Sequence, residues 1–267
     1  MPHPLLEKHR ATLESALDAI ATRGYWSAFP EMPSPKLYGE AAPDEGKRAF
    51  EAHLGKPFEL GQPGQTGWHG GETSPYGVEL GVSYPVCDPD ALIAAGLEAM
   101  KGWQAVGADG RTGICLEILE RLNKQSFEIA HAVMMTTGQG WMMAFQAGGP
   151  HAQDRGLEAV TYAWREQSFV PADTTWEKPQ GKNPALVMKK HFQIVGRGVG
   201  LVIGCGTFPT WNTYPGLFAA LATGNAVIVK AHSNAILPAA ITVRTIRTVL
   251  AENGIDPNLV SLCVATK

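Results

Sequence analysis

Residues 199–233 have the sequence VGLVIGCGTFPTWNTYPGLFAALATGNAVIVKAHS. Two short apolar runs in this stretch are separated by a segment whose composition favours a helix. A second helical segment and a third apolar run follow it. Strand, helix, strand, helix and strand in this order predict parallel strands joined by right-handed crossovers. The predicted boundaries are 199–203, 208–223, 226–229, 238–253 and 259–264.

This order of elements predicts an α/β fold built on a doubly wound parallel sheet. A parallel sheet that is buried on both faces normally continues beyond three strands. Here the chain stops at Lys267, directly after the third apolar run. We therefore expect the sheet to be incomplete and the sequence to be cut rather than finished.

The residues before the sheet predict a layer of helices and an extended arm. Apolar side chains recur at helical spacing in several segments, which are 6–20, 44–54, 88–103, 112–137 and 154–169. Residues 25–39 combine prolines with aromatic side chains and predict an extended strip packed on another surface. Residues 61–77 are too rich in glycine for regular structure, and they form either a connector or a functional loop. Alternation within residues 174–197 predicts extended chain.

Composition excludes several classes of function. The chain has 267 residues, with 22 basic and 25 acidic side chains and a net charge of −3, and it lacks a basic block that could neutralise phosphates. We therefore expect no nucleic-acid partner. No segment is apolar long enough to cross a bilayer, so we expect no membrane partner and a cytoplasmic protein. The four cysteines lie far apart and the eight histidines lack ligand spacing, which argues against disulfides and against a bound metal.

Two loops could bind a ligand, because ligands of open α/β sheets lie at the carboxyl ends of the strands. The first loop carries Gly204 and Gly206, which have no Cβ and let a ligand approach the backbone. The second begins with Lys230, whose ammonium can bond ribose hydroxyls or a phosphate. Residues 196–200, Gly-Arg-Gly-Val-Gly, precede their strand instead of following it, so we reject them as a dinucleotide fingerprint.

Several side chains near these loops have a plain alternative explanation. Cys205 has no base close in sequence, which favours a small thiol filling a turn over a nucleophile. His232 is either a solvated loop residue or a phosphate ligand. Trp211 and Asn212 either face a substrate from the start of the helix or serve packing and capping.

The same two loops resemble the aldehyde dehydrogenase superfamily. Members of that family have a Trp-Asn-Phe-Pro core after the first strand and Val-Lys-Pro-Ser-Glu at the end of the second. This chain has Gly206-Thr-Phe-Pro and Val229-Lys-Ala-His-Ser at the corresponding places, with the family-like Ala219-Ala-Leu-Ala-Thr-Gly-Asn between them. The resemblance extends from about Val78 to the end of the chain.

The resemblance implies a Rossmann-like cofactor domain, an adjoining catalytic domain and a protruding oligomerisation hairpin. Residues 1–80 would form an N-terminal extension, and residues 81–267 the first part of the NAD(P)-binding domain, truncated before the catalytic domain. The implied reaction is NAD(P)-dependent oxidation of an aldehyde. It needs a nucleophilic cysteine and a glutamate base, and no motif resembling either one is visible here. By position, Lys230 would hold the adenosine ribose, while Ile203, Gly204, Gly206 and Thr207 would line the cofactor.

Two departures from the family pattern carry further expectations. Thr207 stands where the family asparagine stabilises the oxyanion, and it offers a single hydroxyl donor. Ser233, with His232 beside it, replaces the glutamate that pairs with ribose hydroxyls. Because a neutral serine and a protonatable histidine remove repulsion of a ribose phosphate, we expect NADP to be favoured, with NAD as the alternative.

The strip that starts at Tyr25-Trp-Ser-Ala-Phe-Pro further resembles the phenylacetic acid degradation branch of the family. That resemblance implies a semialdehyde substrate, for example a ring-opened coenzyme A thioester, and a homo-oligomer when the protein is intact. The isolated segment is expected to be inactive. A nucleotide-binding or scaffolding module without catalysis remains an alternative, and so does an unrelated nucleotide-binding fold.

Overall fold

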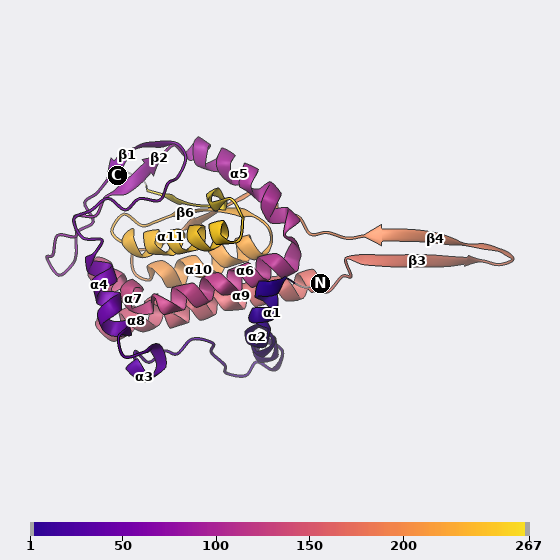
Figure 1. Cartoon of the computed structure of the whole chain (residues 1–267), viewed down its shortest axis with the longest axis horizontal. Coiled ribbons are helices and arrows are strands. Elements are labelled where there is room, and N and C mark those ends of the chain that lie inside the picture. Colours follow the sequence, from indigo (N-terminus) through magenta and orange to yellow (C-terminus); the bar gives the residue numbers. More distant parts are fainter. Residues whose placement is uncertain (1–2, 265–267) are drawn as a thin grey trace.

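A three-stranded parallel sheet with helices on both faces lies at the centre of the molecule (Figure 1). The computed structural model describes residues 3–264. The strands are β5 (Val199–Ile203), β6 (Ala226–Lys230) and β7 (Val260–Cys263), in the spatial order β5-β6-β7. Helices α10 (Pro209–Ala222) and α11 (Leu237–Glu252) join them, and the short 3₁₀-helix η1 (Pro257–Leu259) precedes β7. The predicted strand-helix order and parallel pairing are confirmed.

Small residues let helices approach both faces of the sheet. A Cβ on Gly96 of α5 (Pro89–Ala105) would lie 3.2 Å from the Cβ of Ala226 in β6. On β5, a Cβ on Gly200 would lie 3.2 Å from the Cβ of Ala220 in α10. Since successive strand residues point to opposite faces, α5 covers one face while α10 and α11 cover the other. β6 and β7 are buried on both faces over most of their length, which is why their sequences are continuously apolar, whereas β5 is only partly covered.

A helical layer packs outside α10 and α11. It consists of α6 (Gly107–Lys124), α7 (Ser126–Thr137), α8 (Trp141–Gly148) and α9 (Pro150–Ser168). The carbonyl of Ala222 at the end of α10 accepts hydrogen bonds from Arg111 Nε (3.2 Å) and Gln167 Nε2 (3.1 Å). These buried bonds satisfy a helix-terminal acceptor and tie α6 and α9 to the sheet unit.

Residues before α5 wrap around this layer. Helices α1 and α2 lie against α6 and α9, and α4 packs on α7. Strands β1 and β2 form a small antiparallel pair. The bounds are α1 Pro4–Lys8, α2 Arg10–Thr22, α3 Pro35–Tyr38, α4 Ala42–Glu51, β1 Gln65–His69 and β2 Tyr84–Cys87.

The two edges of the central sheet differ. At the β7 edge, the side-chain amide of Gln62 bonds both backbone groups of Leu262, donating to its carbonyl at 3.0 Å and accepting from its amide. Gln62 therefore replaces a neighbouring strand there. At the β5 edge, Leu201 and Ile203 are 62% and 68% exposed. Residues 3–264 therefore leave these two apolar side chains largely exposed to solvent.

A long two-stranded hairpin projects from the body (Figure 1). It consists of β3 (Asp173–Gln180) and β4 (Asn183–His191), which pair antiparallel, and every residue in both strands is exposed. The extended chain predicted for 174–197 is confirmed. The chain then enters the sheet past the turn after α10, where Asn225 Oδ1 accepts from the amide of Arg197 at 2.7 Å. Residues 196 and 197 have no regular structure and Gly198 is a bend, so this segment connects the hairpin to β5.

Some local predictions were wrong. The first helix breaks at His9, the segment 112–137 breaks at Gln125, and α8 was not predicted. The glycine-rich segment contains β1 and is therefore not wholly irregular. Helix α2 ends at Arg23, which adopts the left-handed conformation (φ 59°). Among residues 3–264, no helix has both the length and the apolar character of a membrane span.

A buried ion-pair cluster attaches the N-terminal helices to α6. Glu117 Oε2 lies 2.5 Å from Lys8 Nζ and 2.8 Å from His9 Nε2, while Glu117 Oε1 lies 3.0 Å from Arg121 Nε. His9, Glu117 and Glu120 are close enough together to serve as metal ligands. Their oxygens, however, already contact ammonium and guanidinium groups, so the cluster is an ion-pair network.

The cluster predicts acid sensitivity. Burial alone would raise the pKa of Glu117, but the bonds from Lys8, His9 and Arg121 outweigh it and hold the pKa at about 2, against an ordinary 4.5. Because the folded-state pKa is lowered, the stabilisation is complete above about pH 4.5 and is lost as pH falls toward 2. We expect Glu117→Gln to lower the free energy of unfolding at pH 7 by about 2–3 kcal/mol and to flatten its pH dependence in that window, measured by urea titration.

Glu98 provides a matched control. It pairs with Lys101 on the exposed surface of α5, so Glu98→Gln should change the free energy of unfolding by less than about 0.5 kcal/mol. Equal losses in the two variants would contradict the role assigned to Glu117.

Candidate functional site

The loop between β5 and α10 lies against the loop that follows β6. The amide of Gly204 donates to the carbonyl of Lys230 at 2.9 Å, which extends the β5–β6 ladder by one bond. A Cβ on Gly204 would lie 3.2 Å from Thr213 Oγ1. A Cβ on Gly206 would lie 3.0 Å from the ring of His232. The two glycines and the histidine predicted for the site are therefore brought together, and the close approach explains why both positions are glycine.

Lys230 ends β6 at the carboxyl edge of the sheet. In the ladder it lies opposite Ile203 on one side and Cys263 on the other, so the three side chains share a face. Its ammonium forms no ion pair with a carboxylate of residues 3–264. Burial raises the pKa of the Cys263 thiol, and the positive charge of Lys230 opposes that rise. The lysine is partly exposed and has a hydrogen-bonding capacity that the described residues do not use.

The residues after Lys230 form a tight turn. The amide of Ala235 donates to the carbonyl of His232 at 2.9 Å, and the amide of Asn234 donates to His232 Nδ1 at 3.2 Å. Because Nδ1 accepts this bond, the neutral ring carries its proton on Nε2. Ser233 Oγ lies 3.4 Å from Asn234 Oδ1 and is partly exposed. His232 and Ser233, both predicted to bind the cofactor, thus lie in the turn that directly follows Lys230.

The start of α10 offers backbone donors. Its first residue is Pro209, no side chain caps it, and the amide of Asn212 makes the first helical bond, to Phe208 O (3.1 Å). The amides of Thr210 and Trp211 precede that bond and have no acceptor among residues 3–264, although Thr210 itself is buried. A helix N-terminus with available amides attracts anionic groups.

Thr207 has an exposed side chain next to these amides. Its carbonyl accepts a hydrogen bond from Gln139 Nε2, whose residue lies between α7 and α8. The sequence did not point to Gln139, since nothing near it in the chain suggests a contact 68 residues away. The hydroxyl of Thr207 makes no hydrogen bond within residues 3–264, so the predicted oxyanion role stays a prediction that this geometry allows.

The side chains of Asn212 and Trp211 make contacts with different neighbours. Asn212 Nδ2 donates to Cys205 Sγ at 2.8 Å, and the amide of Phe208 donates to the same sulfur at 3.2 Å. Trp211 packs against Phe208 and lies beneath Arg155, whose guanidinium carbon is 5.6 Å from the indole centroid. These contacts give both residues a structural role. A substrate role for them stays a prediction.

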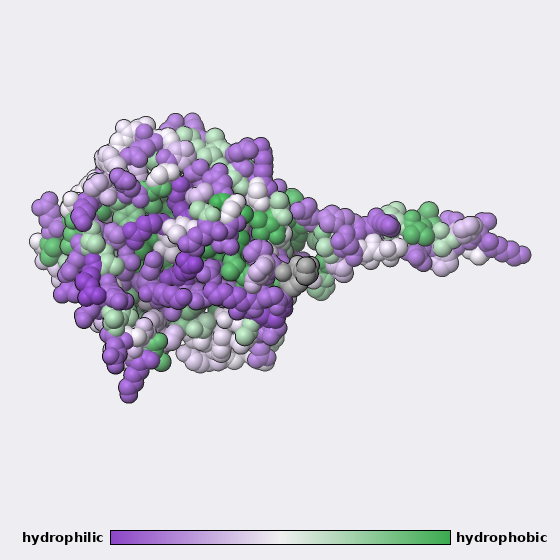
Figure 2. Space-filling view, viewed as in Figure 1, coloured by the Kyte–Doolittle hydropathy of each residue, from purple (hydrophilic) through white to green (hydrophobic). Residues whose placement is uncertain are grey.

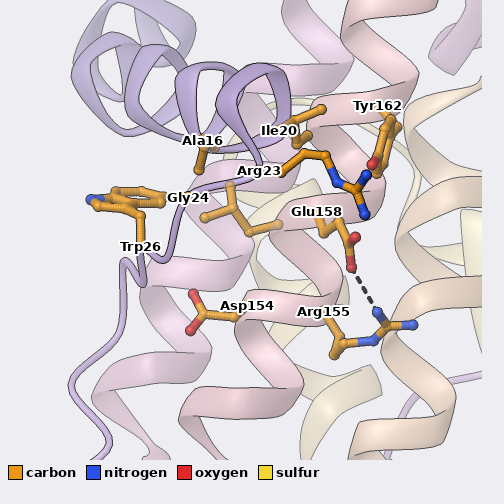
Figure 3. Close-up of a pocket in the computed structure, with 11 residues that line it drawn as sticks. Ala16, Ile20, Arg23, Gly24, Trp26, Asp154, Arg155, Glu158 and Tyr162 are labelled. Carbon is orange, nitrogen blue, oxygen red and sulfur yellow. Dashed lines mark hydrogen bonds and ion pairs between the residues drawn. The ribbon is translucent and has the colours of Figure 1, made fainter.

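A separate half-open cavity of about 330 Å³ lies between α2 and α9 (Figure 3). Trp26 and Arg23 line it, and Arg155 donates to Glu158 at 2.7 Å along its wall. Asp154 accepts from Ser27 Oγ (2.5 Å) and the amide of Ala28 (3.1 Å). The strip that begins at Tyr25 is therefore anchored on α9, and Arg155 in the cavity wall also contacts Trp211 at the start of α10.

Glu72 is the second residue that sequence reasoning missed. Its carboxylate is 5% exposed and accepts from the amides of Ile236 and Leu237, the latter at 3.2 Å, and from the Tyr84 hydroxyl. Burial raises the pKa of Glu72, while these three bonds lower it. The carboxylate thus occupies the N-terminus of α11, directly after the turn that carries His232.

Comparisons with known proteins agree with this geometry. A model of the aldehyde dehydrogenase family matches residues 85–267. The chain is 62% identical to a crystal structure described as an NAD-dependent aldehyde dehydrogenase from Burkholderia multivorans. The match has a TM-score of 0.97 and covers 99% of this chain and 48% of that one. No curated protein is significantly similar to the chain.

More distant structures share the fold alone. One is 1-pyrroline-5-carboxylate dehydrogenase from Thermus with bound NAD, at 16% identity and TM-score 0.64, covering 91% of this chain and 46% of that one. Another is proline utilization A from Bdellovibrio bacteriovorus, at 15% identity and TM-score 0.65, covering 86% of this chain and 23% of that one. The chain spans about half the length of the Burkholderia and Thermus proteins.

The surroundings of the four cysteines predict selective alkylation. Cys205 is partly exposed at the glycine-lined loop. Burial raises the pKa of the other three thiols, that of Cys115 to about 12. We expect iodoacetamide at pH 8 to modify Cys205 at least about tenfold faster than Cys115, read by peptide mass spectrometry. Equal rates at both residues would contradict the described environment.

Proposed function

The chain belongs to the aldehyde dehydrogenase family, and we propose that it forms the dinucleotide-binding part of an NAD(P)-dependent aldehyde dehydrogenase. One observation carries the proposal. Lys230, unpaired among residues 3–264, stands at the carboxyl edge of the sheet, and its backbone bonds to a loop lined by Gly204 and Gly206. A cationic donor beside Cβ-free backbone suits a ligand that carries ribose hydroxyls and phosphates.

The residues present fit a nicotinamide dinucleotide. Lys230 would bond the adenosine ribose, and the exposed side chain of Ile203 would line the cofactor at the same edge. The available amides at the start of α10 suit phosphate oxygens. The bound cofactor would accept a hydride from the substrate. Thr207 would donate its hydroxyl to the oxyanion, and its backbone is held by Gln139.

Aldehyde oxidation also needs a nucleophile and a base. We propose that the intact protein supplies them from outside this chain, because no motif here resembles the family cysteine or glutamate. The coverage of 48% of the Burkholderia protein supports this. The 267-residue chain is then expected to bind the cofactor without oxidising aldehydes.

Thr207 and Ser233 also favour a second candidate, a nucleotide-binding module that has lost catalysis. Both residues depart from the family pattern at positions of chemical importance. Aldehyde oxidation by the intact protein would exclude this candidate, whereas dinucleotide binding without oxidation would support it.

The substrate class rests on sequence resemblance. We propose a semialdehyde, with a coenzyme A thioester of aromatic acid degradation as the specific case, because the strip starting at Tyr25 resembles that branch. The structure gives the strip a defined place, anchored by Ser27 and Ala28 on Asp154. The cytoplasmic location likewise stays a prediction.

The hairpin supports assembly of the intact protein into a homo-oligomer. An isolated two-stranded ribbon is marginally stable in water, so it needs a packing partner. One face carries Trp176, Leu186 and Met188, each between 40% and 48% exposed. Figure 2 shows hydrophobic residues gathered on this projection. A second copy of the chain is the partner we propose for that face.

Lys230→Met tests the cofactor site. The substitution keeps the length of the side chain but removes its charge and its donors. We expect the dissociation constants of NAD and NADP to rise about tenfold, measured by calorimetric titration of the chain. Lys182→Met, in the exposed turn of the hairpin, removes an equal charge far from the site and should leave both constants unchanged. Failure of the unmodified chain to bind either dinucleotide would refute the proposed function.

Ser233→Glu tests the choice of cofactor. We propose that NADP binds more tightly than NAD, because neither Ser233 nor His232 carries a negative charge that would repel a ribose phosphate. A carboxylate at position 233 should raise the dissociation constant of NADP about tenfold relative to that of NAD, in the same titrations. Thr248→Glu adds the same charge on an exposed part of α11 as a control. NAD binding at least as tight as NADP in the unmodified chain would contradict the preference.

A further inference from the structure

Helix α11 obtains its N-terminal cap from a distant segment. Its N-cap residue, Ile236, makes no side-chain cap of its own. Instead, Glu72 Oε1 accepts from the amides of Ile236 and Leu237, across more than 160 residues of sequence. The first-turn amides of a helix need acceptors, and a carboxylate there also interacts favourably with the helix dipole.

The carboxylate is held on its other side as well. The hydroxyl of Tyr84, which is itself fully buried, donates to Glu72 Oε2. Three donors therefore converge on two oxygens; burial raises the pKa of Glu72, and these bonds oppose that rise without cancelling it. Since all of these groups are buried, Glu72 has one defined position, and so does the start of α11.

That position determines where the turn after β6 ends. Residues 231–235 run from Lys230, at the end of β6, to the residue whose amide bonds Glu72. Their two ends are thus fixed by the sheet and by Glu72. Between them His232 packs against Gly206, so the turn also bounds the glycine-lined loop.

We propose that Glu72 is a positioning residue of the dinucleotide site, an inference that rests on the proposed function. It does not reach the nucleotide, because its oxygens are buried and occupied. It holds the turn that presents His232 and Ser233, and through His232 it supports the loop at Gly206. The glycine-rich segment that carries Glu72 is then a functional part of the cofactor site.

The same contact limits how a ribose phosphate is recognised. The amides of Ile236 and Leu237 would be natural donors to a phosphate, but the carboxylate already occupies them. A phosphate at this turn would have to rely on side chains, namely Lys230, His232 and Ser233.

Two substitutions test the proposal. Glu72→Ala removes both acceptors, and we expect it to raise the dissociation constant of the tighter-binding dinucleotide about tenfold or more. Glu72→Gln keeps an oxygen for the two amides, so it should restore the dissociation constant to within about threefold of the unmodified value. Hydrogen exchange, measured without nucleotide, should speed up at the amides of residues 231–237 in Glu72→Ala.

Asp88→Ala is the matched control. Asp88 caps α5 by accepting from the amide of Asp90 at 3.0 Å, so its loss weakens a helix start outside the turn. Its thermal unfolding temperature should fall while nucleotide affinity stays unchanged. If Glu72→Ala changed affinity no more than Asp88→Ala, the positioning role would be overturned.

The exchange measurement separates the two proposals. If the unmodified chain bound neither NAD nor NADP, the proposed function would fail, while faster exchange at residues 231–237 would still show that Glu72 orders the turn. Should Glu72→Ala not fold, Glu72→Gln decides alone. Its weaker bonds should speed exchange at residues 231–237, and unchanged exchange there would overturn the inference.

Discussion

The hydrogen bond from the amide of Gly204 to the carbonyl of Lys230 determines the geometry of the candidate site. It carries the β5–β6 ladder past the last paired residues and brings two loops into contact at the carboxyl edge of the sheet. Glycine suits the contact, because a Cβ at position 204 would crowd Thr213 Oγ1 and one at position 206 would crowd the ring of His232. The helix start, the partly exposed Lys230 and the hydroxyl of Thr207 all lie at the two loops that this bond joins.

Much of the fold could be predicted, because a parallel strand buried on both faces has a continuous apolar sequence. The runs at 199–203 and 226–229 are bounded by glycine or by polar residues, so their ends were clear as well. Other elements carry no such signal. Strand β1 lies in a glycine-rich segment with Trp68 and His69 and shows no alternation. The break at Gln125 has no proline or glycine to mark it, and α8 is a short helix whose methionines fit several structures equally well.

The residues of the candidate site also fall into two groups, those that the sequence predicted and those that it did not. Gly204 and Lys230 were found because each follows an apolar run directly, and position after a strand is a local property of the sequence. Glu72 and Gln139 escaped because their partners lie 164 and 68 residues away. A carboxylate that accepts from backbone amides leaves no pattern in the sequence, since the amides at the start of any helix can donate to it. Tertiary structure alone could show that the missing cap of α11 is supplied by the glycine-rich segment.

The cross-connections of that segment also govern the order in which the chain can fold. Arg247 in α11 donates to the carbonyls of Leu60 and Gly61. Gln62 bonds the backbone of Leu262, and Glu72 accepts from the amide of Ile236. As the polypeptide leaves the ribosome, residues 60–72 emerge long before these partners exist. Closing such large loops is slow, because chain entropy must be spent before the contacts form. We therefore expect residues 60–72 to reach their native contacts only after α11 and β7 have formed.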